Sequence, residues 1–189
     1  MQPILIVGGG PVGLALALVL ARYEVPSIVL EERDEPTPRD ESRAITWVPR
    51  GLDFLDWLGL LPAFARISVR RAAHEFWSPR GRLLSLRMDR LDHPHPYSLL
   101  LPQHDTEATL EAAARATGRV EIRRGTRAVH VATRGTQAVV RVAGRGGAEE
   151  LQAPWAVGCD GARSTVRELL GIESAGATTA PTRRRPTSR

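Results

Sequence analysis

The sequence predicts an α/β fold that begins with a parallel strand, a helix and a second parallel strand. Residues 3–7 form a short apolar run rich in β-branched side chains, which is typical of a buried parallel strand. Three consecutive glycines end this run, and an apolar stretch from Pro11 predicts a helix that stops before Pro26. A second buried strand over 27–31 completes a βαβ unit within about thirty residues.

Later elements are predicted from changes in the apolar period. Leucines at helical spacing predict a helix over 49–60, and alternating residues from position 73 predict a hairpin with its turn at 78–81. A strand over 97–101 and an amphipathic helix over 105–117 follow, with Asp105 or Thr106 as the helix cap. The last predicted elements are strands at 120–123, 128–133, 138–142 and 155–158, a glycine turn at 144–147 and a short helix at 166–170.

Composition excludes several classes of protein. With 42% apolar and 25% charged residues, the 189-residue chain has the composition of a soluble globular protein. Its net charge of +5 comes largely from residues 176–189, because the rest of the chain has 22 arginines against 21 acidic residues. All the basic residues are arginine, and no basic groove with interleaved aromatic residues is visible. We therefore expect no nucleic-acid partner.

Cysteine and hydropathy patterns predict a cytoplasmic protein. Cys159 is the single cysteine, which excludes an intramolecular disulfide and favours a reducing compartment. No apolar stretch approaches the roughly 20 residues that span a bilayer, so we expect no membrane association. His93, His95 and His104 do not complete a ligand pattern with carboxylates, and we interpret them as solvent-exposed loop residues. The prediction is that the chain has no metal site.

The glycines after the first strand form a GxGxxG motif. Gly8 allows a tight turn, Gly10 lets the backbone approach a pyrophosphate, and Gly13 lets the helix pack closely on the strand. The helix start at Pro11 and Val12 would direct free N–H groups and the positive end of the helix dipole toward the phosphates. This arrangement predicts a Rossmann-type dinucleotide-binding domain.

An acidic residue ends the second strand. Glu31 lies 18 residues beyond Gly13, where a carboxylate accepts hydrogen bonds from an adenosine ribose diol. Its charge would repel a 2′-phosphate, so the site favours FAD or NAD over NADP. The motif alone does not decide between FAD and NAD.

Four segments resemble one family over residues 3–173. The family is the aromatic-hydroxylase group of FAD-dependent monooxygenases, to which para-hydroxybenzoate hydroxylase belongs. The matching segments are 7–13 with 29–31, then 42–44, then 101–103 with Glu107 and Leu110, and finally 157–164 with 166–167.

The resemblance implies further cofactor-binding residues. Arg43 matches an arginine that reaches the FAD pyrophosphate, and Gln103 matches a glutamine that contacts the cofactor. Asp160 belongs to an Asp-Gly motif associated with FAD and nicotinamide cofactor binding. We add Glu32, which stands beside Glu31 where the family often has a basic residue. Cys159 has no neighbouring base, and we interpret it as a small core residue.

The implied activity is hydroxylation of an aromatic or polyketide-like small molecule, with FAD as cofactor and NADH or NADPH as reductant. We predict an FAD-binding domain over 1–72 and 101–173, the first strands of a substrate-facing sheet over 73–100, and a disordered arginine-rich tail over 174–189. No residue is assigned a catalytic role.

The chain also departs from the family. No Gly-Asp motif follows Asp160, and the arginine-rich end is typical of a truncated or frame-shifted product. Two alternatives therefore stand beside the monooxygenase: a non-catalytic FAD-binding fragment that needs a partner chain, and an NAD-dependent dehydrogenase. An unfinished sheet would expose strand edges, so we expect the isolated chain to self-associate, which a monodisperse monomer would contradict.

Overall fold

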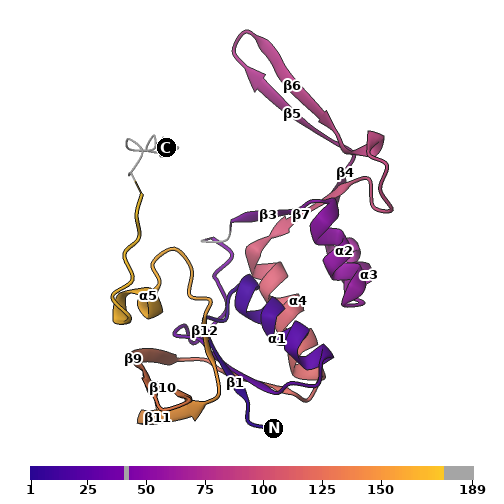
Figure 1. The fold of residues 1–189 in the computed structure, drawn as a ribbon. Helices are drawn as coiled ribbons and strands as arrows, with labels where there is room; N and C mark the ends of the chain where they lie inside the picture. The colour runs from indigo at the N-terminus through magenta and orange to yellow at the C-terminus, as the bar shows by residue number, and fades with distance from the viewer. Residues whose placement is uncertain (41–42, 177–189) are drawn as a thin grey trace.

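The centre of the molecule is a four-stranded parallel sheet in the order β12-β1-β2-β8, seen in a computed structural model that describes residues 1–40 and 43–176 (Figure 1). Its strands are β1 (Ile4–Val7), β2 (Ser27–Leu30), β8 (Val120–Arg123) and β12 (Ala156–Gly158), and all three pairings are parallel. Together with helix α1 (Pro11–Arg22), these strands confirm the predicted βαβ unit and α/β class.

Each face of the sheet has its own core because side chains alternate along a strand. Ile6 and Val29 face helices α1 and α4 (Gln103–Ala116), where Leu14 and Leu110 are fully buried. Leu5, Val7 and Leu30 face the opposite way, toward a second sheet. The parallel sheet is therefore the middle of three layers, as its continuous apolar runs predict.

The second sheet is antiparallel, with order β11-β10-β9. Its strands are β9 (Thr126–Arg134), β10 (Gln137–Gly144) and β11 (Gly147–Ala153). The predicted glycine turn at 144–147 joins β10 to β11, but the sequence did not predict β11 itself. Residues 147–150 of this strand are all exposed, so it has no apolar alternation to detect.

A third sheet has the order β3-β7-β4 and carries two short helices. Strand β7 (Ser98–Pro102) was predicted, whereas β3 (Ala44–Trp47) and β4 (Val69–Arg71), which pair with it, were not. The single helix predicted over 49–60 is instead α2 (Pro49–Trp57), followed by α3 (Leu61–Ile67). Gly59, at φ +73°, breaks the helix between them.

The N-terminal cap predicted for α4 is wrong. The helix begins at Gln103 with Pro102 as its cap residue, and no side chain accepts from the free N–H groups there. Asp105 instead pairs with Arg39 at 2.9 Å, and Thr106 donates its hydroxyl to the Pro102 carbonyl. Asp105 thus contacts the loop after β2, and only Thr106 bonds within the first turn of the helix.

The predicted hairpin projects away from the three layers (Figure 1). It consists of β5 (Ala73–Ser78) and β6 (Gly81–Arg87), followed by the short 3₁₀ helix η1 (Met88–Arg90). Five large apolar side chains of the hairpin are exposed: Phe76, Trp77, Leu83, Leu84 and Leu86. A free-standing hairpin of this kind is marginally stable by itself and leaves apolar area uncovered.

Strand β12 is followed by a short helix, α5 (Thr165–Leu169). The Ser164 side chain caps it by accepting from the Arg167 N–H at 3.0 Å, and the helix lies one residue before the predicted range of 166–170. The predicted disordered tail falls mostly on residues 177–189, which lie outside the described residues. Among the residues that the structure does describe, no helix is long and apolar enough to cross a membrane.

Candidate dinucleotide-binding site

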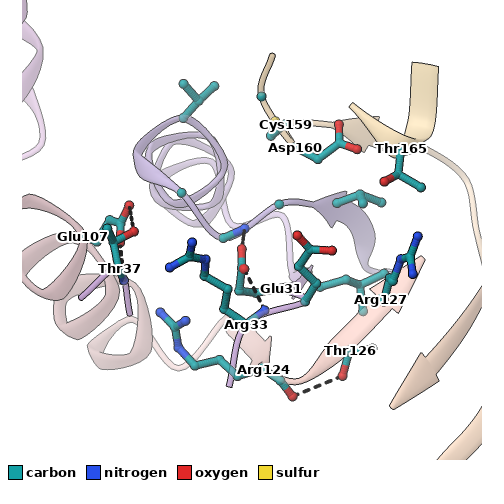
Figure 2. A pocket seen from close by; sticks show the side chains of 18 of the residues that line it. Glu31, Arg33, Thr37, Glu107, Arg124, Thr126, Arg127, Cys159, Asp160 and Thr165 are labelled. Carbon is teal, nitrogen blue, oxygen red and sulfur yellow. Dashed lines mark hydrogen bonds between the residues drawn. The ribbon is translucent and has the colours of Figure 1, made fainter. Parts of the chain in front are cut away.

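A cavity of about 310 Å³ opens at the carboxyl ends of β1, β2 and β12. In open α/β sheets this edge is where ligands bind. Figure 2 shows its wall from Glu31 and Arg33 across to Asp160 and Thr165. The predicted site residues that line it are Gly8, Gly10, Pro11, Val12, Glu31, Glu32, Gln103 and Asp160.

The glycines of the motif have three different surroundings. Gly8 has φ +110°, and a Cβ there would lie 2.6 Å from the Cys159 backbone. A Cβ at Gly13 would lie 1.9 Å from the Gly8 carbonyl oxygen, whereas a Cβ at Gly10 would meet no atom within 4 Å. Gly8 and Gly13 are thus required for packing, and Gly10 leaves open space above the backbone.

Helix α1 presents its N-terminus to this open space. Its first turn contains Pro11 and Val12, and Val12 is exposed. No side chain caps the helix, and no acidic residue lies in the first turn. The N–H groups and positive dipole end are therefore left for an anion, as the motif predicts.

Glu31 ties the end of β2 to the glycine turn. Its Oε2 accepts from the Gly9 N–H at 2.6 Å, and its Oε1 accepts from the Arg33 N–H at 2.9 Å (Figure 2). A Cβ at Gly9 would lie 2.9 Å from the Glu31 Cβ, so a third glycine is needed here. Gly9 was assigned no role from its position between Gly8 and Gly10, although the run of three glycines is the signal that marks it.

Asp160 lies at the cavity but also orders the turn that follows it. Its two carboxylate oxygens accept from the Ser164 hydroxyl at 2.6 Å and from the Val166 N–H at 3.0 Å. Burial and the charge of Asp160 raise the pKa of the neighbouring Cys159 thiol. The thiol is therefore protonated at neutral pH, in keeping with its interpretation as a core residue.

Gln103 and Arg43 meet through their backbones. The Gln103 N–H donates to the Arg43 carbonyl at 2.7 Å, beside the β3 and β7 pairing. The Gln103 side chain lines the cavity, whereas the Arg43 side chain is exposed and is not part of the lining. The structure thus brings Gln103 to the cavity without the predicted arginine.

Several lining residues carry no local sequence signal. Most of them come from the loop after β2, from α4 and from the end of β8 with the start of β9, which lie side by side because β8 pairs with β2. Two others come from the turn after β12 and from the start of α5. The additional polar lining residues are Arg33, Glu35, Thr37, Glu107, Arg124, Thr126, Arg127, Arg163 and Thr165. Of these residues, Glu107 and Arg163 belonged to segments that carried the family resemblance.

Arg124 is held at the cavity by a largely buried ion pair. Its guanidinium lies 2.5 Å from Glu111 on α4, and only 15% and 14% of the two side chains are exposed. Burial alone would raise the pKa of Glu111, but hydrogen bonds from Arg124 and Arg115 outweigh it and lower that pKa. The pair connects α4 to the end of β8.

We expect Glu111→Gln to destabilise the protein by about 1–3 kcal/mol at pH 7, because a neutral amide with a single oxygen replaces the carboxylate that accepts from two guanidinium groups. A carboxyl with a lowered pKa in the folded state stabilises above its unfolded pKa, and this contribution is lost as the pH falls through the folded value. The variant should therefore show a flatter loss of stability below about pH 4.5.

Denaturant unfolding between pH 3 and pH 7 measures this difference. Glu24→Gln is the matched control, because Glu24 pairs with Arg119 at the surface and should contribute less than about 1 kcal/mol. Parallel stability curves for the wild type and Glu111→Gln would show that the ion pair does not contribute as argued.

Within residues 1–40 and 43–176, no three His, Cys, Asp or Glu side chains group so that they could hold a metal ion. The interpretation of His93 and His95 as solvent-exposed is wrong. His93 contacts Asp53 at 3.1 Å and His95 contacts Asp56 at 3.4 Å, with 24% and 17% of the histidine side chains exposed. These contacts fasten the loop before β7 to α2.

Comparison with known proteins identifies the family. The sequence model of the family described as "FAD binding domain" matches residues 1–183. The chain belongs to this family. Its relatives include an uncharacterized aromatic compound monooxygenase, YhjG, of Bacillus subtilis, which is 38% identical over 174 residues that make up 90% of this chain and 33% of the relative.

Solved structures of a hydroxylase and of a flavin-dependent monooxygenase have the same fold. OxyS anhydrotetracycline hydroxylase from Streptomyces rimosus superposes with a TM-score of 0.85 at 33% identity, covering 94% of this chain and 35% of that protein. The flavin-dependent monooxygenase PieE, solved in complex with FAD and substrate, gives a TM-score of 0.80 at 28% identity, with coverages of 93% and 33%. The chain spans about a third of the length of these proteins.

The cavity fits the dinucleotide of this family, FAD. The space above Gly10 and the uncapped start of α1 suit a pyrophosphate, and both oxygens of Glu31 lie at the neighbouring strand end, where a ribose diol would meet them. Assignment of the individual contacts remains a prediction.

Proposed function

We propose that this chain binds FAD and forms the N-terminal FAD-binding portion of a monooxygenase. The enzyme would hydroxylate an aromatic or polyketide-like small molecule and use NADH or NADPH as reductant. The observation that carries the proposal is the open backbone at Gly10 beside an uncapped helix start and the Glu31 carboxylate. FAD, when bound, supplies the electron transfer to dioxygen that no protein side chain provides.

The residues of the chain then bind and orient the cofactor. The first turn of α1 would hold the pyrophosphate, Glu31 would accept from the ribose, and Gln103 would contact the middle of the cofactor. Arg43 keeps its predicted role at the pyrophosphate, since its backbone is fixed beside Gln103 and its exposed side chain can turn. Asp160 and Glu32 complete the set on the wall of the cavity.

The substrate-facing part is proposed to begin with residues 73–100. The exposed apolar side chains of β5 and β6 support this assignment, because a sheet face of this kind is normally covered. The same exposed face supports self-association of the isolated chain, which sedimentation velocity measures directly. The single cysteine continues to favour the cytoplasm.

A second candidate is a non-catalytic FAD-binding fragment that needs a partner chain. The specific observation in its favour is that the hairpin of β5 and β6 stands free and exposes large apolar side chains. The family match to an FAD-binding domain weighs against the NAD-dependent dehydrogenase.

Titration with FAD, followed by flavin fluorescence, tests the proposal. We expect saturable binding by the wild type and a Kd about 10- to 100-fold higher for Glu31→Gln, because a charged acceptor of the ribose hydroxyls becomes neutral. Glu24→Gln is the control and should bind as the wild type does. Anaerobic addition of NADH or NADPH then separates the two candidates, because only a complete flavin module is reduced.

A folded wild-type chain that does not bind FAD at micromolar concentrations would overturn the proposal. Cooperative thermal unfolding in the same buffer establishes that the chain is folded.

A further inference from the structure

A buried carboxylate on the cavity wall has no role in the proposed function. Glu107 lies in the first turns of α4, is 4% exposed and lines the cavity together with Thr37 and Gln103. Figure 2 shows it beside Thr37, on the α4 side of the cavity. A buried acid is costly unless its oxygens are fully hydrogen-bonded, so its partners decide what it does.

Within the described residues, the hydrogen bonds of the Glu107 side chain are all accepted by its carboxylate. Its Oε2 accepts from the Thr37 N–H at 3.1 Å, and its Oε1 accepts from the Thr37 hydroxyl at 3.1 Å and from Gln103 Nε2 at 2.7 Å. A carboxylate offers only acceptors, so the hydroxyl hydrogen of Thr37 and the NH₂ group of Gln103 must both point toward it. The Glu107 charge thereby fixes the direction of both side chains.

The polar groups that the two side chains have left are mostly acceptors. With one N–H of its NH₂ group donated to Glu107, Gln103 has its carbonyl oxygen and one further N–H left for a ligand, and Thr37 has the lone pairs of its hydroxyl. Acceptors next to a buried negative charge disfavour phosphate oxygens and favour a group that donates a hydrogen. The start of α1, which offers N–H donors, has the opposite polarity.

We propose that Glu107 is a positioning residue that makes this wall of the cavity accept hydrogen bonds, so that it receives a hydroxyl-bearing sugar part of the dinucleotide and not the pyrophosphate. This inference rests on the proposed function for the identity of the ligand. The orientation of Gln103 does not depend on the ligand and is testable without it.

Glu107→Gln provides a sharp test because it can keep all three contacts while reversing the direction of two of them. The new amide oxygen can accept from the Thr37 N–H, and the new NH₂ group can donate to the Thr37 hydroxyl and to the Gln103 carbonyl. Gln103 must then turn its own NH₂ group toward the cavity. The melting temperature should stay within about 4 °C of the wild type, which corresponds to at most roughly 1 kcal/mol.

The first readout uses the chain without ligand. In the wild type the side-chain NH₂ signal of Gln103, identified by its loss in Gln103→Ala, should exchange slowly with solvent because Glu107 accepts from it. In Glu107→Gln this signal should exchange at least about tenfold faster, because the group then faces the cavity. Equal exchange in the two proteins would overturn the assigned orientation.

The second readout is the FAD dissociation constant. Glu107→Gln should raise this dissociation constant about fivefold, the effect of losing roughly one hydrogen bond. In a Gln103→Ala/Thr37→Val background, the same substitution should raise the dissociation constant by less than about twofold. Asp105→Asn is the matched control in the same turn, since Asp105 pairs with Arg39 and contacts neither Gln103 nor Thr37. It should leave FAD binding unchanged.

Tighter or unchanged FAD binding by Glu107→Gln would overturn the proposal, because it would mean that the wall meets a phosphate or nothing. An equal loss in both backgrounds would show that Glu107 does not act through Gln103 and Thr37. Absence of FAD binding by the wild type would instead refute the proposed function, while the exchange measurement would still decide the orientation of Gln103.

Discussion

Replacement of Gly13 by alanine is expected to prevent the domain from folding stably. The added Cβ would lie 1.9 Å from the Gly8 carbonyl oxygen, 3.1 Å from the Gly8 carbonyl carbon and 3.3 Å from an Ile6 methyl group. The nearest atoms belong to the backbone and cannot rotate away, so α1 would have to separate from β1. Overpacking typically costs about 1–3 kcal/mol, and a backbone clash lies at or above the upper end of that range.

Denaturant unfolding of the two proteins checks this expectation. A loss of 3 kcal/mol or more is a large part of the roughly 5–15 kcal/mol by which domains are stable. Gly146→Ala is a control, because a Cβ there would meet no atom within 4 Å. A Gly13→Ala protein as stable as the wild type would mean that α1 and β1 pack less closely than described.

Gly10→Val is expected to abolish FAD binding while the fold is kept. Gly10 has φ −75°, which any residue adopts, and a Cβ there would point into open space. The valine methyl groups would fill the volume that the pyrophosphate needs to reach the start of α1. We expect the FAD dissociation constant to rise at least about 100-fold and stability to fall by less than about 1 kcal/mol.

Flavin fluorescence and thermal unfolding of the same sample measure both quantities. The contrast with Gly13→Ala is the informative part, because one glycine is needed for packing and the other for the ligand. Retention of FAD binding by a folded Gly10→Val protein would place the pyrophosphate elsewhere and would remove the main support for the proposed function.

Local patterns were enough to predict the first part of the fold. The GxGxxG turn, the helix from Pro11 and the strand before Glu31 depend on neighbouring residues, so the sequence contains the whole signal. Strands β3 and β4 were not predicted because each is short and contains no buried residue, and each exists through its pairing with β7. Propensity does not reveal such pairings.

The residues of the candidate site also fall into two groups, those that local spacing predicts and those that strand pairing brings to the cavity. Gly8, Gly10 and Glu31 were predicted from spacing and lie at the cavity. Thr37 and Arg124 reach it because β8 pairs with β2, over a separation that no motif spans. Glu107 matched the family, but its three contacts become visible only when α4 and the loop after β2 are seen together.

The outermost strand of the parallel sheet also has a consequence for biosynthesis. Residues 156–158 pair directly with residues 5–7. Strand β1 is therefore synthesised first but can pair with β12 only after residue 158 has been made. At roughly 5–20 residues per second, that wait is on the order of ten seconds, during which Leu5 and Val7 lack part of their final cover. Contacts so distant in sequence also slow folding after release. The nucleotide cavity, which needs Cys159 and Asp160 for one wall, therefore forms only after nearly the whole described chain has been synthesised.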